Sequence, residues 1–321
     1  MEHAHKELVT IFGGAGFVGT QVVQALARKG YRIRVAVRRP DLAGHVRPLG
    51  GVGQIQPVQA NIRNLESVQR AVEDADIVIN LVGILFETSR QKFDTVQTIG
   101  AKNVAEAAAS AGASVLVHMS ALGADLESES AYARSKALGE TAVLKAFPKA
   151  IVMRPSIVFG QDDGFFNKFG TLARLSPILP VIGGNSRFQP VYVGDVAEAI
   201  AAAAQGAGKG GAIYELGGPD IETVRDLMER TLRESVRSNL LVPIPVRFAK
   251  LKAWFLQILP SPLLTVDQVE LLQSDNMVSD KAKKQNRTLA AFGITPASMD
   301  VILPTYMWRF RKHGQFSKAK A

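Results

Sequence analysis

The sequence contains no cysteine, which excludes structural disulfides, thiolate metal sites and cysteine nucleophiles. Apart from His3 and His5 near the amino terminus, no two histidines have the spacing of metal ligands, so we expect no metal site. No run of about 18 apolar residues occurs, so we expect no membrane-spanning helix. The residues before Leu8 include neither the apolar core of a signal peptide nor a transit peptide, which favours a cytoplasmic protein.

The composition is that of an ordinary globular protein, with 321 residues of which 47% are hydrophobic and 21% charged. This length suffices for one large core or two modest domains. The net charge of +9 is unevenly placed, because residues 240–321 contain 12 basic but only 5 acidic residues. No recognised nucleic-acid-binding module accompanies this charge, so we expect no nucleic-acid partner.

Short β-branched runs alternate with helical patterns along the first half of the chain. The expected strands are Leu8–Phe12, Ile33–Val37, Ile55–Ala60, Ile77–Val82, Val115–Ser120 and Ile151–Arg154. The expected helices are Val18–Lys29, Leu65–Ala75, Thr95–Ala111 and Ala131–Ala146. This alternation predicts an α/β fold, a Rossmann-type doubly wound parallel sheet.

The second half is less regular, and prolines break it between residues 243 and 262. We expect strands at Phe188–Val193 and Ala212–Leu216, helices at Glu222–Val236 and Val246–Leu259, and a frayed end at Ser317–Ala321. The predicted domains are a dinucleotide-binding domain of residues 1–218, with some insertions after residue 160, and a small, basic, mostly helical C-terminal lobe of residues 219–321.

A glycine-rich turn follows the first expected strand and opens the first expected helix. Its residues are Gly13, Gly14, Ala15, Gly16, Phe17, Val18 and Gly19, which match GxxGxxG and, from Gly14, GxGxxG. Glycine is needed where the backbone turns tightly, approaches a pyrophosphate or lets a helix pack on a strand. The helix N-terminus offers free N–H groups to phosphates. The turn therefore predicts dinucleotide binding, and an empty vestigial turn is the alternative.

The end of the second expected strand indicates which dinucleotide binds. An NAD site usually has an acidic residue there, but this strand ends at Val37 and is followed by Arg38 and Arg39. A guanidinium binds a 2′-phosphate, whereas a carboxylate repels it. We therefore predict NADP(H), with a solvated basic turn as the alternative. By their places after later strands, the further cofactor-binding candidates are Asn61 and Ile62 at the adenine, and Leu81, Val82 and Gly83 close to the cofactor.

A serine, a tyrosine and a lysine form a candidate catalytic set. Ser120 ends the fifth expected strand, and the next helix contains Tyr132 and Lys136 one turn apart on one face. Lys136 would lower the pKa of the Tyr132 phenol and could bind the nicotinamide ribose. Tyr132 could then exchange a proton with a substrate oxygen that Ser120 positions. The alternative is an ordinary surface pair of tyrosine and lysine.

These motifs together resemble the short-chain dehydrogenase/reductase superfamily in its extended or atypical branch, over residues 8–218. The matching residues are the Gly13–Gly19 turn, Ser120, Tyr132, Lys136, Arg154–Gly160 and Gln189–Ala197. The resemblance implies that Pro155, Ser156, Ile157 and Val158 lie in the loop against the nicotinamide. Gln97 stands where the extended branch usually has asparagine.

Within this superfamily the chain is similar to the NADPH-binding accessory subunits of respiratory complex I. The similar segments are Tyr132–Glu140, Ala146–Ile151, Arg154–Gly160, Asp162–Asn167, Gln189–Asp195 and Leu240–Pro245. The similarity implies a structural NADP(H) and, as a partner, complex I or another membrane respiratory or quinone-related assembly. It also implies a peripheral position on the cytoplasmic face of the inner membrane.

The expected helix Val246–Leu259 combines basic residues with large apolar ones, including Trp254 and Phe255. Trp308–Lys312 has the same character. This composition is typical of a helix lying in an anionic membrane interface. The alternative is a helix that packs on the core and leaves its lysines in solvent.

Three functions remain open at this point. The first is a cofactor-binding component of a membrane assembly, and the second is an active NADPH-dependent reductase of a small carbonyl substrate. The third is a sensor that reports the NADPH/NADP⁺ ratio to a partner. The sequence does not indicate a substrate.

Overall fold

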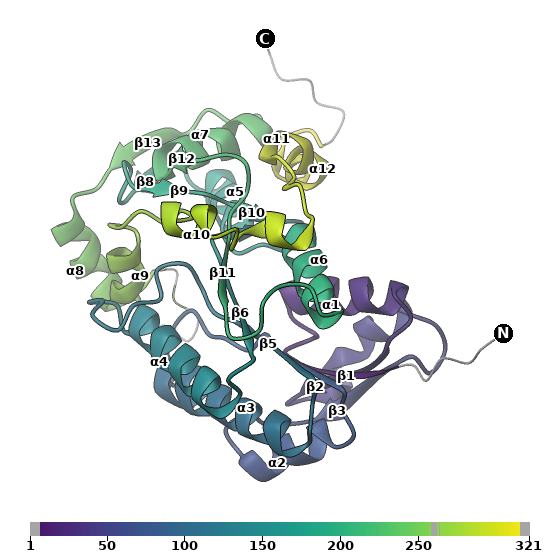
Figure 1. The fold of residues 1–321 in the computed structure, drawn as a ribbon. Helices are drawn as coiled ribbons and strands as arrows, with labels where there is room; N and C mark the ends of the chain where they lie inside the picture. Colours follow the sequence, from purple (N-terminus) through teal and green to yellow (C-terminus); the bar gives the residue numbers. More distant parts are fainter. Residues whose placement is uncertain (1–6, 258–261, 263, 315–321) are drawn as a thin grey trace. The chain divides into compact units, whose positions relative to one another are not determined.

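The computed structural model describes residues 7–257, 262 and 264–314, and these form two compact units (Figure 1). The first unit contains the chain up to Pro155 together with Gly194–Leu216 and Asp280–Thr295. The second unit contains Ser156–Val193, Gly217–Ser279 and the chain from Pro296. The chain thus passes repeatedly from one unit to the other. We expected instead two domains that follow one another along the chain, with a boundary at residue 218, and that division stays a prediction.

The first unit is built on a seven-stranded parallel sheet, which confirms the expected Rossmann-type α/β fold. Its strands in spatial order are β11 (Ile213–Leu216), β6 (Ile151–Pro155), β5 (Val115–Met119), β4 (Ile77–Asn80), β1 (Leu8–Phe12), β2 (Arg32–Val37) and β3 (Ile55–Gln59). The strand order reverses between β1 and β4. In open parallel sheets, ligands bind beyond the carboxyl ends of the strands at such a reversal.

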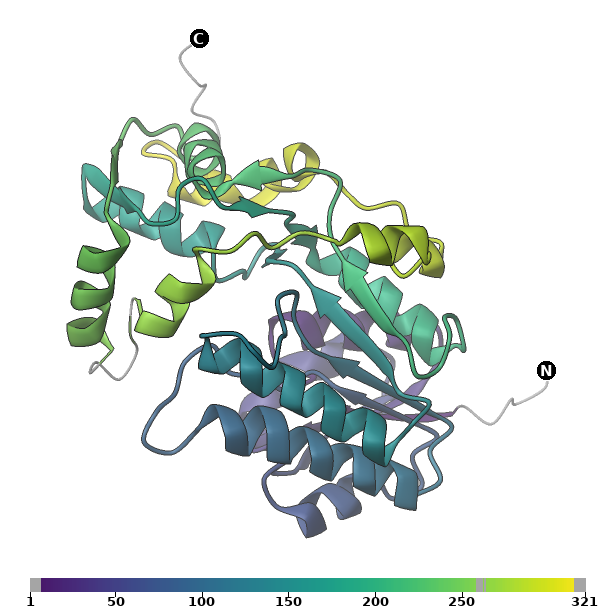
Figure 2. The same cartoon turned by 60° about the vertical axis from the view of Figure 1, so that its left-hand side comes forward.

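Helices cover both faces of this sheet (Figures 1 and 2). One face carries α1 (Phe17–Arg28) and α6 (Val193–Ala204), and the other carries α2 (Leu65–Val72), α3 (Gly100–Ser110) and α4 (Ala131–Ala146). Since both faces are covered, the central strands are mostly apolar, and every residue of β4 is buried. Their buried polar residues include Asn80 at the end of β4 and His118 near the end of β5.

The expected helix Thr95–Ala111 has a different beginning in the structure. A π-helical turn, η2 (Asp94–Ile99), precedes α3. This turn brings the backbone carbonyl of Gln97 close to α4. A Cβ atom at Gly139 of α4 would lie only 2.2 Å from the Gln97 oxygen. Only a glycine at position 139 allows this approach. Such π turns within helices are frequent at functional sites.

The expected strand Phe188–Val193 is wrong. The segment forms two short strands in different pairs, β9 (Arg187–Phe188) and β10 (Val191–Tyr192), and α6 begins at Val193. Pro190 separates the two strands, because proline has no N–H to donate to a ladder. The expected helix Glu222–Val236 likewise begins as a strand, β12 (Glu222–Thr223), before α7 (Val224–Glu234).

The second unit packs short strand pairs and helices around its own apolar core. Its remaining elements are β7 (Val158–Phe159), α5 (Phe166–Leu175), β8 (Ile178–Val181), β13 (Leu240–Pro243), α8 (Val246–Leu256), α9 (Val266–Leu271), α11 (Met299–Ile302), α12 (Pro304–Met307) and η4 (Trp308–Phe310). The buried Asp163 accepts a hydrogen bond of 2.6 Å from the Tyr306 hydroxyl. This bond ties the C-terminal segment to the segment before α5.

The first unit also contains the 3₁₀ segments η1 (Pro40–Leu49) and η3 (Leu289–Phe292) and the helix α10 (Asp280–Lys284). Among the described residues, no helix is both long and apolar enough to cross a membrane. His3, His5, the expected helix end at Ile258 and Leu259, and Ser317–Ala321 lie outside the described residues.

Candidate functional site

The glycine turn between β1 and α1 is tightly folded. Gly13 has a φ of +81°, and its carbonyl accepts a hydrogen bond of 3.1 Å from the Gly16 amide. A Cβ atom at Gly19 would lie 2.2 Å from the Gly13 oxygen and 2.6 Å from the Gly14 Cα atom. Glycine at position 19 therefore lets the first turn of α1 pack directly on the loop.

The N-terminus of α1 is free to receive an anion. Its capping residue is Gly16, and no side chain caps the helix. The first amides of a helix have no partner within the helix, and together they carry partial positive charge. The turn thus has both the close backbone approach and the uncapped helix that a dinucleotide pyrophosphate requires.

Replacing Gly19 by alanine is expected to destabilise the protein, because the new methyl group would overlap backbone atoms that cannot move aside. Overpacking of this kind costs roughly 1–3 kcal/mol. Gly16→Ala is the matched control, since the new Cβ atom would lie 3.4 Å from its nearest neighbour, the Gly13 oxygen, which is an ordinary contact distance. Thermal unfolding measures both variants, and an unfolding temperature of Gly19→Ala equal to that of Gly16→Ala would contradict the packing argument.

Arg38 and Arg39 follow β2 and are both exposed, but their electrostatic surroundings differ. Arg39 forms an ion pair of 2.8 Å with Asp41, and this contact lowers the pKa of the Asp41 carboxyl. Arg38 donates instead to the neutral side-chain oxygen of Gln91 at 2.9 Å. The charge of Arg39 is therefore matched within the protein, whereas that of Arg38 remains available to an anion.

The other cofactor candidates of the first unit lie at the ends of β3 and β4. Asn61 accepts hydrogen bonds from the backbone and side chain of Arg63. Ile62 is buried against Gly100 of α3. Leu81 and Val82 pack against the turn, 3.3 Å from the position of a Cβ atom at Gly13. The close approach of β4 to the turn agrees with the expected path of a cofactor, while direct contacts stay a prediction.

Lys136 is buried on α4, with 4% of its surface exposed. Its ammonium donates to the Met119 carbonyl at 3.2 Å and lies 6.0 Å from the centre of the Tyr132 ring. Burial lowers the pKa of Lys136 to about 8, although the nearby Glu140 carboxylate acts in the opposite direction. Tyr132 is partly buried, and its ring meets Phe93 edge-on at 5.8 Å.

Three buried polar atoms on the elements around Lys136 have no hydrogen-bond partner in the described part of the chain: Gln97 Oε1, His118 Nε2 and Ser120 Oγ. Burial, together with the charge of Lys136, lowers the pKa of His118 to about 3, so its ring is neutral. A Cβ atom at Gly83 would lie 3.2 Å from Lys136 Nζ and 3.4 Å from Gln97 Oε1. Gly83 thus leaves space beside these two polar groups.

Gln97 was not among the expected site residues, although it stood out in the sequence as a glutamine at an asparagine position. Its side-chain amide donates to Ser135 at 2.8 Å, and Ser135 is the residue before Lys136. The π-helical turn directs Gln97 toward α4. No local sequence pattern predicts the π-helical turn, because the turn depends on the space that Gly139 leaves on the neighbouring helix.

A buried ion pair joins β6 to α4 close to Lys136. Arg154 of β6 donates twice to Glu140 of α4, at 2.7 and 2.6 Å, and Glu140 is 5% exposed at its side chain. Glu140 lies one helical turn after Lys136. The pair neutralises a carboxylate that would otherwise hold the Lys136 proton more strongly.

Arg154→Met is expected to destabilise the protein by about 3–5 kcal/mol, because it leaves the Glu140 carboxylate buried without a partner. The double variant Arg154→Met with Glu140→Leu removes both charges and is expected to recover most of the stability. Denaturant unfolding of the single and double variants measures the difference. A single variant as stable as the double would show that the pair does not hold this region together.

The four candidates of the nicotinamide loop are consecutive in the chain where the first unit's segment ends and the second unit's begins. Pro155 ends β6 in the first unit, whereas Ser156, Ile157 and Val158 belong to the second. The Ser156 hydroxyl donates to the side-chain oxygen of Asn276 at 2.7 Å. The contact of these four residues with a nicotinamide stays a prediction.

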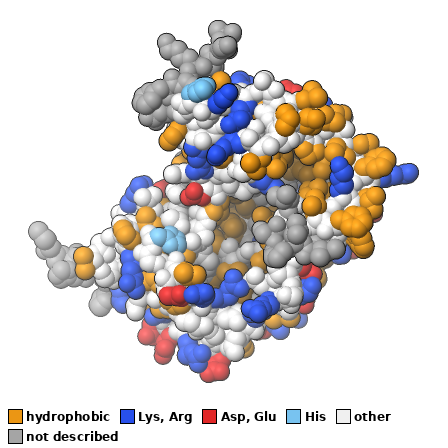
Figure 3. All heavy atoms as spheres, turned by 180° about the vertical axis from the view of Figure 1, so that it is seen from behind, with side chains coloured by type: hydrophobic (Ala, Val, Ile, Leu, Met, Phe, Trp, Pro, Cys, Tyr) orange, Lys and Arg blue, Asp and Glu red, His pale blue; other side chains and the backbone are white. Residues whose placement is uncertain are grey.

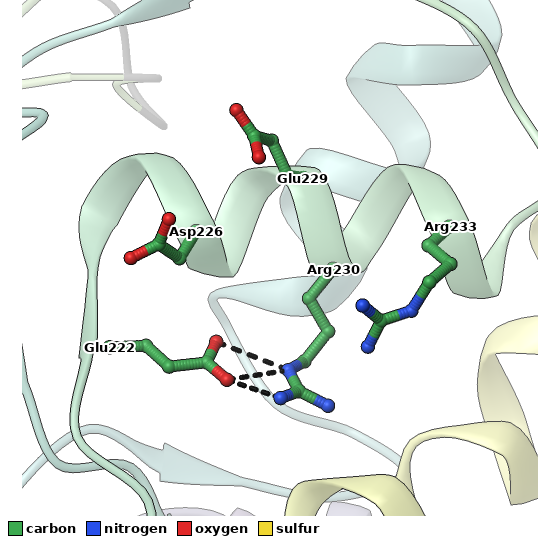
Figure 4. A pocket seen from close by; sticks show the side chains of 5 residues that line it. All are labelled: Glu222, Asp226, Glu229, Arg230 and Arg233. Carbon is green, nitrogen blue, oxygen red and sulfur yellow. Dashed lines mark hydrogen bonds and ion pairs between the residues drawn. The ribbon is translucent and has the colours of Figure 1, made fainter.

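A shallow pocket on β12 and α7 of the second unit lies apart from these motifs in the sequence (Figure 4). Its lining residues are Glu222, Asp226, Glu229, Arg230 and Arg233. Arg230 is held by Glu222, as Figure 4 shows, and also by Asp300, which raises its pKa further. Because its central cation is already paired with protein carboxylates, we interpret this pocket as a structural ion-pair network.

The comparisons with known proteins agree with this geometry. The mitochondrial NADH dehydrogenase (ubiquinone) 1 alpha subcomplex subunit 9 of Arabidopsis thaliana is 36% identical over 290 residues, covering 86% of this chain and 72% of that protein. The ceramide reductase of Caulobacter vibrioides is 35% identical over 197 residues, covering 61% of each protein. A solved NADPH-dependent quinone oxidoreductase of Escherichia coli shares the fold, with a TM-score of 0.70 and 18% identity over 93% of this chain and 98% of that one.

The reversal of strand order at an uncapped, glycine-lined helix defines a Rossmann-type protein. The model of the NAD dependent epimerase/dehydratase family matches residues 9–217. The chain belongs to this family.

Proposed function

We propose that this protein binds NADP(H) as a lasting structural cofactor and serves as an accessory component of respiratory complex I or a related membrane assembly. The observation that carries the proposal is the 36% identity to a complex I subunit over 86% of the chain, a span that must include most of both units. The similarity to ceramide reductase covers only 61% of the chain.

Residues of the first unit fit the cofactor. The Gly13–Gly19 turn and the uncapped α1 would hold the pyrophosphate, and Arg38 would hold the 2′-phosphate. Lys136 and Tyr132 would lie at the nicotinamide ribose. Bound in this way, a nicotinamide could supply hydride-transfer chemistry, and a structural role would keep that chemistry unused.

The experiment is isolation of the tagged protein from gently solubilised membranes of its own cells. We expect complex I subunits to co-purify, together with about one NADP(H) per protein chain after denaturation, because a structural cofactor does not dissociate on purification. A second isolation with the tag on an unrelated cytoplasmic oxidoreductase serves as the control. A purified protein without nucleotide and without respiratory partners would overturn the proposal.

An active NADPH-dependent reductase is the second candidate, and the lowered pKa of Lys136 favours it. Catalytic sites often contain a lysine whose pKa burial has moved toward neutrality. In this case Tyr132→Phe would abolish the oxidation of NADPH by carbonyl substrates while leaving NADPH binding intact. Absence of any carbonyl-dependent oxidation in the native protein would exclude this candidate for the substrates assayed.

A further inference from the structure

The loop that connects β4 to η2 contains a compact turn, residues 87–93. The Thr88 amide donates to the Gln91 carbonyl at 2.9 Å, and the Gln91 amide donates to the Thr88 hydroxyl at 3.1 Å. Glu87 accepts hydrogen bonds from the Phe93 amide and the Lys92 ammonium. The turn is therefore ordered by contacts within itself.

Two arginines from neighbouring strand ends hold this turn through adjacent residues. Arg38, after β2, donates to the Gln91 side chain at 2.9 Å, and Arg63, after β3, donates to the Arg90 carbonyl at 2.7 Å. Asn61 accepts from the Arg63 side chain on its other edge, at 3.3 Å. Because Arg90 and Gln91 are consecutive, the two arginines contact the same short turn from neighbouring strand ends.

The groups that accept hydrogen bonds from Arg38 and Arg63 are all uncharged amide oxygens. No ion pair joins Arg38, Arg63 or Arg90 to a carboxylate in the described part of the chain, whereas the neighbouring Arg39 and Lys92 pair with Asp41 and Glu87. A guanidinium without a carboxylate partner can bind an anion without breaking an ion pair. Arg38 and Arg63 thus both remain available to a phosphate.

We propose that Arg63 acts with Arg38 to bind the 2′-phosphate of NADP(H), and that the bound phosphate fastens the turn of residues 87–93. Nothing in the sequence motifs pointed to Arg63 or to this turn. The proposal rests on the proposed binding of NADP(H) and adds to it a second specificity-determining residue. NAD(H) has no 2′-phosphate, so its binding would not fasten the turn, which would open as readily as in the protein without nucleotide.

Limited digestion with trypsin tests the proposal on the full-length protein, because trypsin cleaves after Arg90, whose carbonyl accepts from Arg63. Saturating NADPH is expected to slow cleavage at the bond between Arg90 and Gln91 by about tenfold or more, since proteolysis follows local opening of the chain. Saturating NADH is expected to change the rate little. Equal protection by the two nucleotides would overturn the proposal.

Arg63→Met is expected to weaken NADPH binding by about tenfold and to abolish the selective protection, while NADH binding stays unchanged. Arg32→Met is the matched control, since Arg32 is an exposed arginine at the opposite end of β2 with no ion pair in the described residues. If Arg63→Met does not fold, Gln91→Ala replaces it and is expected to speed cleavage without nucleotide and to reduce the protection by NADPH. Unchanged protection in that variant would overturn the role of the turn.

The outcomes separate this inference from the proposed function. Equal affinity of the native protein for NADPH and NADH would contradict the proposed NADP(H) binding itself. A native preference for NADPH that Arg63→Met leaves unchanged would overturn only the role of Arg63.

Discussion

Replacing Arg38 by alanine is expected to weaken the binding of NADPH by about 10- to 100-fold, because a hydrogen bond between charged groups contributes roughly 1.5–3 kcal/mol. Arg38 is exposed, and its only hydrogen bond in the described part of the chain goes to the neutral Gln91 side chain. Its remaining N–H groups can therefore bind a 2′-phosphate without breaking an ion pair. Binding of NADH, which has no such phosphate, is expected to change little. Calorimetry with both nucleotides measures the difference.

Arg39→Ala is the matched control for this experiment. Arg39 has the same charge and the neighbouring position, but it already pairs with Asp41 at 2.8 Å. We expect its loss to weaken NADPH binding by less than about threefold, since exposed ion pairs contribute little and a paired guanidinium is less available. Equal affinity of the native protein for NADPH and NADH would contradict both expectations. A larger effect for Arg39 than for Arg38 would contradict the assignment of the phosphate to Arg38.

Replacing Trp254 and Phe255 together by serine is expected to abolish binding to anionic liposomes at low salt. Their side chains, with those of Phe248 and Leu251, form the exposed apolar face of α8, where each is between 54% and 63% exposed. Burial of one large apolar side chain contributes roughly 1.5–3 kcal/mol, so the loss of two lowers binding by about 100-fold or more. Figure 3 shows hydrophobic side chains gathered on this part of the second unit, with Lys and Arg among them.

The charges of α8 determine how salt affects this binding. Lys252 and Arg247 are exposed, and a basic residue near an anionic bilayer contributes about 1 kcal/mol. Lys250 contributes less because it already pairs with Glu270 of α9. Sedimentation with liposomes should therefore weaken as salt rises. Leu42→Ser is the control, since Leu42 is 64% exposed but lies in the first unit. Failure of the native protein to sediment with anionic liposomes at low salt would contradict the expected binding of lipid.

The orientation of α8 could not be read from its sequence. A helix with both aromatic and small residues was expected either to lie in a membrane interface or to pack on the core. In the structure α8 buries its alanines, Ala249 and Ala253, against Val269 of α9 and leaves its large side chains outside. The small alanine side chains allow the two helices to approach closely. The helix therefore buries its alanine face, although its large apolar side chains would lose more contact with water on burial.

The sheet and the glycine turn were predictable because their signals are local. Strands such as Leu8–Phe12 and helices such as Ala131–Ala146 occur with the expected bounds, since burial on two faces and helical periodicity depend on residues near in sequence. The strand at Phe188–Val193 failed for the opposite reason. Its two halves pair with different distant strands, and no local pattern indicates that choice.

The sequence by itself determined the Rossmann-type sheet, the turn from Gly13 to Gly19 and the helical spacing of Tyr132 and Lys136. Only the tertiary structure decided the state of each charge in the site. It buried Lys136, matched Arg39 with Asp41, and left Arg38 and Arg63 on neutral acceptors of one turn. The physical reason is that backbone periodicity depends on neighbours along the chain. Burial and ion pairing depend on which side chains the fold brings together from distant positions.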